Sequence, residues 1–206
     1  SVADIAAYVP GVAISNGGAP GQNGVVIRGL ATSYNNSFNA PLVVTYIDDQ
    51  PTGASAGGFG GARGGAYTLD LMPYDVEKVE VLRGPQGTLY GANAMGGILK
   101  YSLKRPDLKA FEARAGGELA HVASGGGLDW GLRGAINVPL VTDKLAIRIS
   151  AYNRETAGYL DNIGIGRENS NSTRTTGGRV AILFAPSVRF DIEASVLAQR
   201  IRSDDS

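Results

Sequence analysis

The feature that most constrains the fold is a series of long segments in which apolar and polar residues alternate. In the last of these segments, Phe190, Ile192 and Ala194 are each followed by one polar residue. Because successive side chains of a strand point to opposite faces, this period of two predicts β-strands with one apolar and one polar face. Five such segments follow one another, at about residues 109–121, 128–139, 144–157, 172–185 and 188–201.

The connections between these segments alternate between short and long. Those around residues 141–143 and 186–187 are short, whereas the one at residues 158–171 is long and polar. This layout is typical of an outer-membrane β-barrel, and the segments exceed the usual length of globular strands. A soluble β-sandwich also alternates and is a common antiparallel architecture, so the periodicity leaves both open. Consecutive strands of this number leave two sheet edges unpaired, and we expect the chain to continue beyond its C-terminus.

The first half of the chain has a different sequence pattern, in which short apolar runs are separated by glycine-rich stretches. The 30 glycines of the chain indicate turns and close backbone approaches rather than long helices. Short helical turns are expected at residues 1–8, after Leu71 and after Pro85. The texture changes at a Lys-Arg-Pro-Asp sequence, which predicts a small mixed α/β domain at residues 1–106 and a strand domain at residues 107–206. The strand candidates of the first domain are Val25–Arg28, Leu42–Asp48, Val76–Arg83 and Ile98–Leu103.

The composition excludes several classes of function. The chain has 206 residues with 19 basic and 19 acidic side chains, so its charge does not indicate nucleic acid as a partner. Because it has no cysteine and His121 is its single histidine, we expect no metal site, no cofactor and no catalytic triad. No window reaches the roughly eighteen apolar residues of a membrane helix. The start lacks an initiator methionine and the regions of a signal peptide, so we expect the chain to begin inside a longer one.

Two glycine-rich runs and one acidic pair are weak candidates for binding sites. Residues 91–98 have the glycine spacing of a phosphate loop, but Gly97 and Ile98 stand where a lysine and a hydroxyl residue are needed. Residues 57–65 do not match the dinucleotide fingerprint. The neighbouring carboxylates of Asp48–Asp49 point to opposite sides of an extended chain, which favours a turn over an acid pair.

Two arginines share a more informative context. Arg28 and Arg83 each end a predicted strand and are followed at once by glycine. On an isolated domain such an arginine is simply solvated. Inside a barrel lumen it needs a carboxylate partner, because an unpaired buried charge is costly.

The order of short motifs in the first half resembles the plug domain of the TonB-dependent receptors of the bacterial outer membrane. Each motif is weak alone, whereas their ordered combination is specific. One departure is Asp49, which stands where family members often have glycine. In chain order the motifs are YVPGV at 8–12, IRGL at 27–30, YIDDQP at 46–51, VEKVEVLRGPQGTLYG at 76–91 and MGGI at 95–98.

The resemblance implies a fold and a function. It implies an α+β plug domain followed by antiparallel β-strands of an incomplete transmembrane β-barrel in the outer membrane. The function implied is active uptake of a scarce nutrient, most often a ferric siderophore. The expected partners are the ligand, the outer-membrane lipid and TonB, which in the family binds a box upstream of the plug that has no counterpart before Ser1.

The resemblance also implies roles for individual residues. Arg28 and Arg83 correspond to plug residues that pair with barrel glutamates and lock the plug, and those glutamates are expected on strands later than the ones in this chain. Plug loops that face outside are expected to contact the ligand. The candidates in these loops are Asn35, Asn36, Phe38, Phe59 and Arg63.

Two other functions remain to be weighed against transport. A passive outer-membrane channel shares the barrel but has no use for the plug motifs. A soluble β-rich binding module fits the alternation, and solubility without detergent is the observation that favours it. An enzyme is the least favoured class, since no nucleophile, base or metal cluster stands out.

Overall fold

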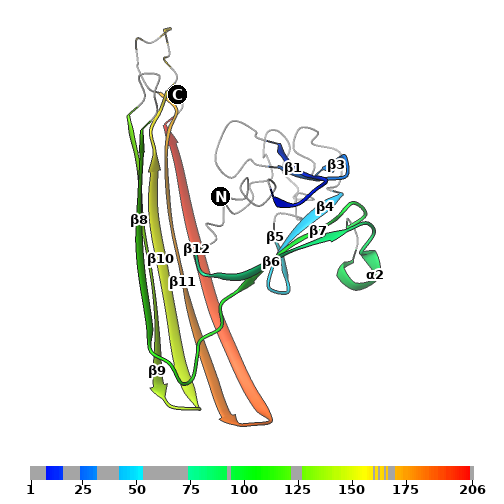
Figure 1. Cartoon of the computed structure of the whole chain (residues 1–206), viewed down its shortest axis with the longest axis vertical. Coiled ribbons are helices and arrows are strands. Elements are labelled where there is room, and N and C mark those ends of the chain that lie inside the picture. The colour runs from blue at the N-terminus through cyan, green and yellow to red at the C-terminus, as the bar shows by residue number, and fades with distance from the viewer. Residues whose placement is uncertain are drawn as a thin grey trace. The chain divides into compact units, whose positions relative to one another are not determined.

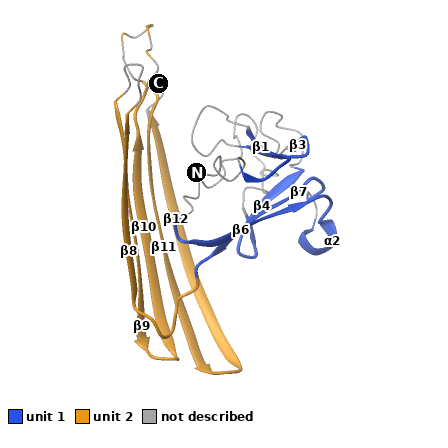
Figure 2. Ribbon diagram, viewed as in Figure 1, with its two compact units in different colours: residues 1–104 blue, residues 105–206 orange. Residues whose placement is uncertain are grey.

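The computed structural model describes residues 8–15, 24–31, 42–52, 74–91, 94–121, 127–159, 161, 163–164, 166 and 170–204. The chain forms two compact units, residues 1–104 and 105–206 (Figure 2). The domain boundary expected from the sequence lies two residues beyond this division. Among the described residues, no helix has the length and apolar character needed to cross a membrane.

The first unit contains two small sheets (Figure 1). The three-stranded sheet is antiparallel and has the order β1-β2-β3, with β1 at Val12–Ser15, β2 at Gly24–Ile27 and β3 at Leu30–Ala31. The four-stranded sheet has the order β5-β4-β7-β6, with β5 at Gln50–Thr52, β4 at Val43–Ile47, β7 at Gly97–Leu103 and β6 at Val76–Arg83. Its central pair, β4 and β7, is parallel.

The core of the first unit is built on that central pair. Strands buried on both faces read as nearly continuous apolar runs, and Val43, Val44 and Tyr46 of β4 are all buried. On β7, Ile98 is fully buried and packs in one cluster with Val44 and Tyr46. The Tyr46 hydroxyl donates a 2.7 Å hydrogen bond to the Tyr90 carbonyl, which fastens the short helix α2 (Gly87–Tyr90) to the sheet.

The strands expected in the first half are all present, and the structure adds three that the sequence did not indicate. These three, β1, β3 and β5, have four, two and three residues. The runs of β3 and β5 contain too few residues to show a period, so only the hydrogen bonds of their neighbours define them. The helix expected after Pro85 is confirmed as α2. The helical turns expected at residues 1–8 and after Leu71 fall largely outside the described residues.

The second unit is one antiparallel sheet in which neighbours in sequence are neighbours in space, in the order β12-β11-β10-β9-β8 (Figure 1). All five strands predicted from the alternation are confirmed, with lengths of 10 to 16 residues. Their long and short connections alternate as expected. The strands are β8 (Glu112–His121), β9 (Leu128–Val141), β10 (Leu145–Thr156), β11 (Ser172–Ser187) and β12 (Phe190–Asp204).

The register of this sheet separates its residues into two faces. Ile149 lies directly opposite Ile136 on one side and Val180 on the other, and Val180 lies opposite Val196. We call the face that carries these four residues the apolar face. Their exposed fractions are 36% to 72%. Large exposed apolar patches mark surfaces that face a membrane or a partner rather than water. The opposite face, which carries buried arginines, we call the ionic face.

Candidate functional site

The loop that follows Arg83 is closed by its own backbone hydrogen bonds. The Gly84 amide donates to the Gly96 carbonyl at 3.2 Å, and the Gln86 amide donates to the Ala94 carbonyl at 2.8 Å. Gly84 and Gly91 have φ angles of 90° and 77°, a region that favours glycine because it has no Cβ atom. The glycines therefore allow the chain to leave β6, turn twice and return as β7.

Gly97 permits a close approach at the start of β7. Its φ is 142°, and a Cβ atom there would lie 2.4 Å from the carbonyl oxygen of Leu82 and 3.1 Å from Cδ1 of Ile27. Ile27 belongs to the other sheet of this unit and is fully buried. The absence of a side chain at Gly97 thus lets the two sheets pack at this point.

Arg28 and Arg83 are both exposed. Arg28 has a φ of 52°, and its amide donates a 2.9 Å hydrogen bond to the Gly11 carbonyl. Arg83 is the last residue of β6. Among the described residues, neither side chain has an ion-pair partner, so their role in a lock stays a prediction. The expected ligand-contact residues, Asn35, Asn36, Phe38, Phe59 and Arg63, lie outside the described part of the chain.

The turn predicted at Asp48–Asp49 is confirmed, and its two carboxylates have separate partners. Asp48 has a φ of 51°, and its Oδ1 accepts a 2.8 Å hydrogen bond from the Leu103 amide. Lys100 donates from Nζ to Oδ1 of Asp49 at 2.9 Å. This hydrogen bond is the main cause that raises the pKa of Lys100 above its ordinary value. Asp48 and Asp49 therefore form the turn between β4 and β5 rather than an acid pair.

The ionic face of the second unit holds arginines whose partners lie on other strands. Arg148 on β10 is 2% exposed and donates from Nη1 to Oε2 of Glu112 on β8 at 3.2 Å. Arg179 on β11 is 4% exposed and donates from Nη2 to Oε1 of Glu193 on β12 at 3.3 Å. Because a buried charge without a partner is strongly destabilising, these pairs hold the strands in register. Reading the sequence alone missed them, although charged residues on the same face of neighbouring strands, or of strands one further apart as for Arg148 and Glu112, are a usable signal.

Arg105, the first residue of the second unit, is fixed to this face. Its Nη2 donates to Asp191 at 2.6 Å and its Nε donates to Glu193 at 2.7 Å. These hydrogen bonds raise the pKa of Arg105 above its ordinary value, and the one to Asp191 is the largest cause. Two separate carboxylates on β12 thus hold a guanidinium that lies 86 and 88 residues away in sequence.

Asn137 holds the next part of the same linker. This side chain is fully buried. Its Oδ1 accepts a 2.9 Å hydrogen bond from the Asp107 amide, and its Nδ2 donates to the carbonyls of Asp107 and Ala110 at 2.9 Å and 2.7 Å. We call residues 105–110, together with Asn137, Asp191 and Glu193, the linker clamp. It fastens the segment that leads into β8 to the sheet.

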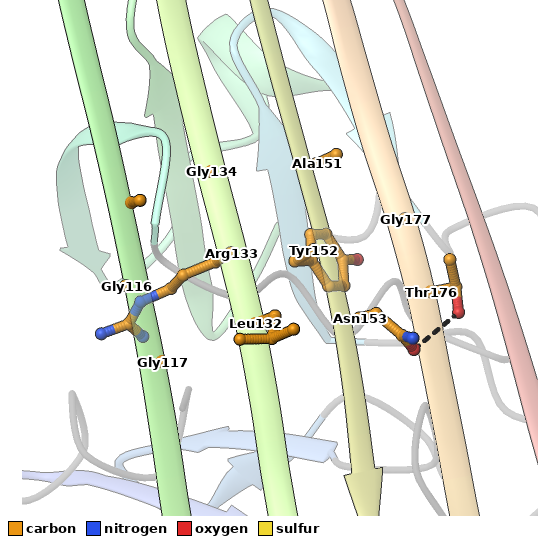
Figure 3. A pocket seen from close by; sticks show the side chains of 11 residues that line it. Gly116, Gly117, Leu132, Arg133, Gly134, Ala151, Tyr152, Asn153, Thr176 and Gly177 are labelled. Carbon is orange, nitrogen blue, oxygen red and sulfur yellow. Dashed lines mark hydrogen bonds between the residues drawn. The ribbon is translucent and has the colours of Figure 1, made fainter.

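A shallow trough of about 670 Å³ crosses β8 to β11 (Figure 3). Most of the residues that line it belong to the apolar face. Among them, Ala115, Gly134 and Ala151 lie directly opposite one another on β8, β9 and β10 and have little or no side chain. Thr176 also lines the trough and donates from Oγ1 to Oδ1 of Asn153 at 3.0 Å. Small residues on successive strands therefore hollow the surface of the sheet.

The comparisons with known proteins agree with this architecture. Residues 1–98 match the family described as TonB-dependent Receptor Plug Domain. The chain is 27% identical over 180 residues to the pesticin receptor of Yersinia enterocolitica, which covers 86% of this chain and 24% of that protein. It is 31% identical over 124 residues to the ferrichrome outer membrane transporter/phage receptor of Escherichia coli, which covers 56% of this chain and 14% of that protein.

Solved structures show the same fold. The ferric yersiniabactin uptake receptor FyuA from Yersinia pestis matches with a TM-score of 0.73 and 24% identity, over 95% of this chain and 28% of that one. The pyoverdine outer membrane receptor FpvA from Pseudomonas aeruginosa matches with a TM-score of 0.68 and 17% identity, over 96% and 25% of the two chains. The chain thus spans about a quarter of the length of these proteins.

Proposed function

We propose a transport function for the protein that carries this chain. The premise is that the chain belongs to the TonB-dependent receptors of the bacterial outer membrane, the family whose plug domain matches residues 1–98. Its location is therefore the outer membrane, and its relatives are receptors and transporters rather than enzymes. The first unit is the plug. The antiparallel sheet of the second unit resembles the start of the barrel in this family.

The specific function that we propose is active uptake of a ferric siderophore. Relatives and structural neighbours support this ligand class by what they are named for, which includes ferrichrome, ferric yersiniabactin and pyoverdine. A relative named as a vitamin B12 transporter makes cobalamin the second candidate. TonB is the proposed energy-coupling partner. Contacts with the ligand are proposed for Asn35, Asn36, Phe38, Phe59 and Arg63.

The observation that carries the proposal is a plug fold followed directly by a sheet with an exposed apolar face. A passive channel has no need of a plug. A soluble module has no reason to leave Val180 and Val196 exposed on a continuous face, because apolar surface of that extent associates in water. Both rivals are therefore less well supported than transport.

An uptake assay tests the ligand class. Cells that depend on the protein carrying this chain are given ferric siderophores of several types or cobalamin, each radiolabelled. We expect energy-dependent accumulation of one ferric siderophore and none of cobalamin. Accumulation of cobalamin alone would contradict siderophore uptake and support the second candidate. Accumulation of neither a ferric siderophore nor cobalamin would contradict transport of either ligand class.

Arg83→Ala tests the proposed lock. If Arg83 pairs with a barrel carboxylate, its removal leaves that buried charge unpaired and loosens the plug. We expect siderophore uptake to fall severalfold, or sensitivity to large antibiotics to increase. The matched control is Lys78→Ala, which removes another cation from β6, one whose side chain is 58% exposed and pairs only with neighbouring Glu80 among the described residues. Wild-type uptake together with wild-type antibiotic sensitivity in Arg83→Ala would count against the lock.

A further inference from the structure

The apolar face of the second unit ends in a group of arginines at one end of the strands. Along β12, the residues with the parity of this face are apolar up to Ala198, and the next two are Arg200 and Arg202. Arg200 lies opposite Thr176, and Arg202 lies opposite Arg174. This end is the one at which the long connection between β10 and β11 lies. On β11 and β12, three arginines therefore stand beyond the last apolar residues of this face, whereas the same row continues with Trp130 on β9 and Leu119 on β8.

The charges of this group are not balanced within the described residues. Directly opposed residues of an antiparallel pair have Cβ atoms about 5 Å apart, and like charges in that position repel. Arg174 and Arg202 are such a pair. Glu155 lies opposite Arg174 and accepts a 3.0 Å hydrogen bond from its Nε. Among the described side chains, this part of the face therefore carries one carboxylate, that of Glu155, and three guanidiniums. The side chains of Asp204 and Asp205, which follow in the sequence, lie outside the described part of the chain.

The position of the group matches the headgroup level of a membrane. From Phe190 to Ala198 the apolar part of β12 extends about 26 Å at about 3.3 Å per residue. At the usual strand tilt this is about 20 Å across the bilayer, which is comparable with the apolar band of about 25 Å in outer-membrane barrels. Charged side chains are costly within that band and tolerated at its edge. Arg200 and Arg202, both exposed, lie beyond the edge.

The trough lies beside this group in the register of the sheet. Thr176 lines the trough and stands directly opposite Arg200. The hollow row at Gly134 and Ala151 lies further towards the apolar part of the same face. A surface depression lined largely by small and apolar groups, with guanidiniums next to it, has the two chemical parts that an acidic lipid needs.

We propose that Arg174, Arg200 and Arg202 bind the phosphate groups of the phosphorylated glycolipid that forms the outer leaflet of the membrane, and that the trough takes one of its acyl chains. Guanidinium binds phosphate with two parallel hydrogen bonds. A bound phosphate also removes the repulsion between Arg174 and Arg202. This inference rests on the proposed function, because membership of the family directs the long connections outwards.

The experiment uses the full-length protein that carries this chain, purified from outer membranes in a neutral detergent. Its binding to bisphosphorylated lipid A, to the same lipid without phosphates and to phosphatidylglycerol is measured by native mass spectrometry. We expect the double variant Arg200→Gln/Arg202→Gln to bind the bisphosphorylated lipid at least tenfold more weakly than wild type. The control is Arg189→Gln, which removes an exposed arginine from the short turn between β11 and β12.

One further variant, which conserves the charge, makes the result decisive. Arg200→Lys/Arg202→Lys keeps the charge and is expected to recover most of the binding, which a misfolded protein does not. Folding of each variant is checked by its altered mobility on unheated gels. Unchanged binding in the glutamine variant, equal binding of the lipid without phosphates, or equal binding of phosphatidylglycerol overturns the proposal. Siderophore uptake is scored separately, so a protein that binds the glycolipid but transports no ligand contradicts the proposed function alone.

Discussion

Gly97→Ala is expected to destabilise the first unit by about 3 kcal/mol or more, because the new Cβ meets the backbone and has no space to move. The Cβ would lie 2.4 Å from the Leu82 carbonyl oxygen, and the φ of 142° is itself unfavourable for a residue with a side chain. Relief would require β6 and β7 to separate where Arg83 pairs with Gly97. Hydrogen exchange of the β6 and β7 amides in the full-length protein measures the effect.

The matched control for this variant is Gly87→Ala in α2. A Cβ atom at Gly87 meets nothing within 4 Å, and its φ is not in the left-handed region. Because alanine favours helix over glycine by about 1 kcal/mol, this change is expected to be neutral or slightly stabilising. Equal exchange rates in Gly97→Ala and wild type would show that the close approach at Gly97 is not required for the fold.

Asn137→Leu is expected to release the linker clamp, at a cost of about 3 kcal/mol or more. Leucine is close in size but removes the partners of three backbone groups, the Asp107 amide and the carbonyls of Asp107 and Ala110. Each buried group left without a partner costs about 1–3 kcal/mol. We expect faster proteolysis of residues 105–110 and lower uptake, because a pull on the plug is then no longer resisted where the chain enters the sheet.

Two other variants separate this effect from a general loss of stability. Asn137→Asp keeps the acceptor for the Asp107 amide but turns a buried carboxylate oxygen towards the carbonyls of Asp107 and Ala110, so it is expected to release the clamp at least as strongly as Asn137→Leu. Asn153→Leu makes the same kind of change on the apolar face, where Asn153 accepts one hydrogen bond from Thr176, and is expected to have little effect. Proteolysis that is as fast in Asn153→Leu as in Asn137→Leu would contradict a specific role of the clamp.

The long strands and the Asp48–Asp49 turn were predictable because their causes are local. A strand with one apolar face repeats its pattern every second residue, and β9 to β12 are each 12 residues or longer, so each contains several repeats of it. The turn follows from adjacent polar residues before Pro51. By contrast, β3 and β5 have only two and three residues. Such strands exist because a neighbour supplies hydrogen bonds, which no short run of residues encodes.

For the candidate site, too, only the local features could be predicted from the sequence. The ordered plug motifs identified the family, and the match over residues 1–98 confirms it. The sequence did not indicate that Asn137 binds the linker or that Asp191 and Glu193 hold Arg105. That the carboxylates for Arg28 and Arg83 lie on later strands stays a prediction. The sequence also did not indicate that Glu112 and Glu193 pair with arginines of this sheet.

The sequence by itself therefore determined the period of the strands, the two faces of each one and the family, since these depend on residue types at short spacing. The tertiary structure decided which charges meet. Glu112 and Arg148 are 36 residues apart, and Arg105 and Glu193 are 88 residues apart. Such pairs depend on strand order and register, and a shift by one residue moves every side chain to the other face. Only the folded sheet specifies that register, and with it the clamp and the basic edge of the apolar face.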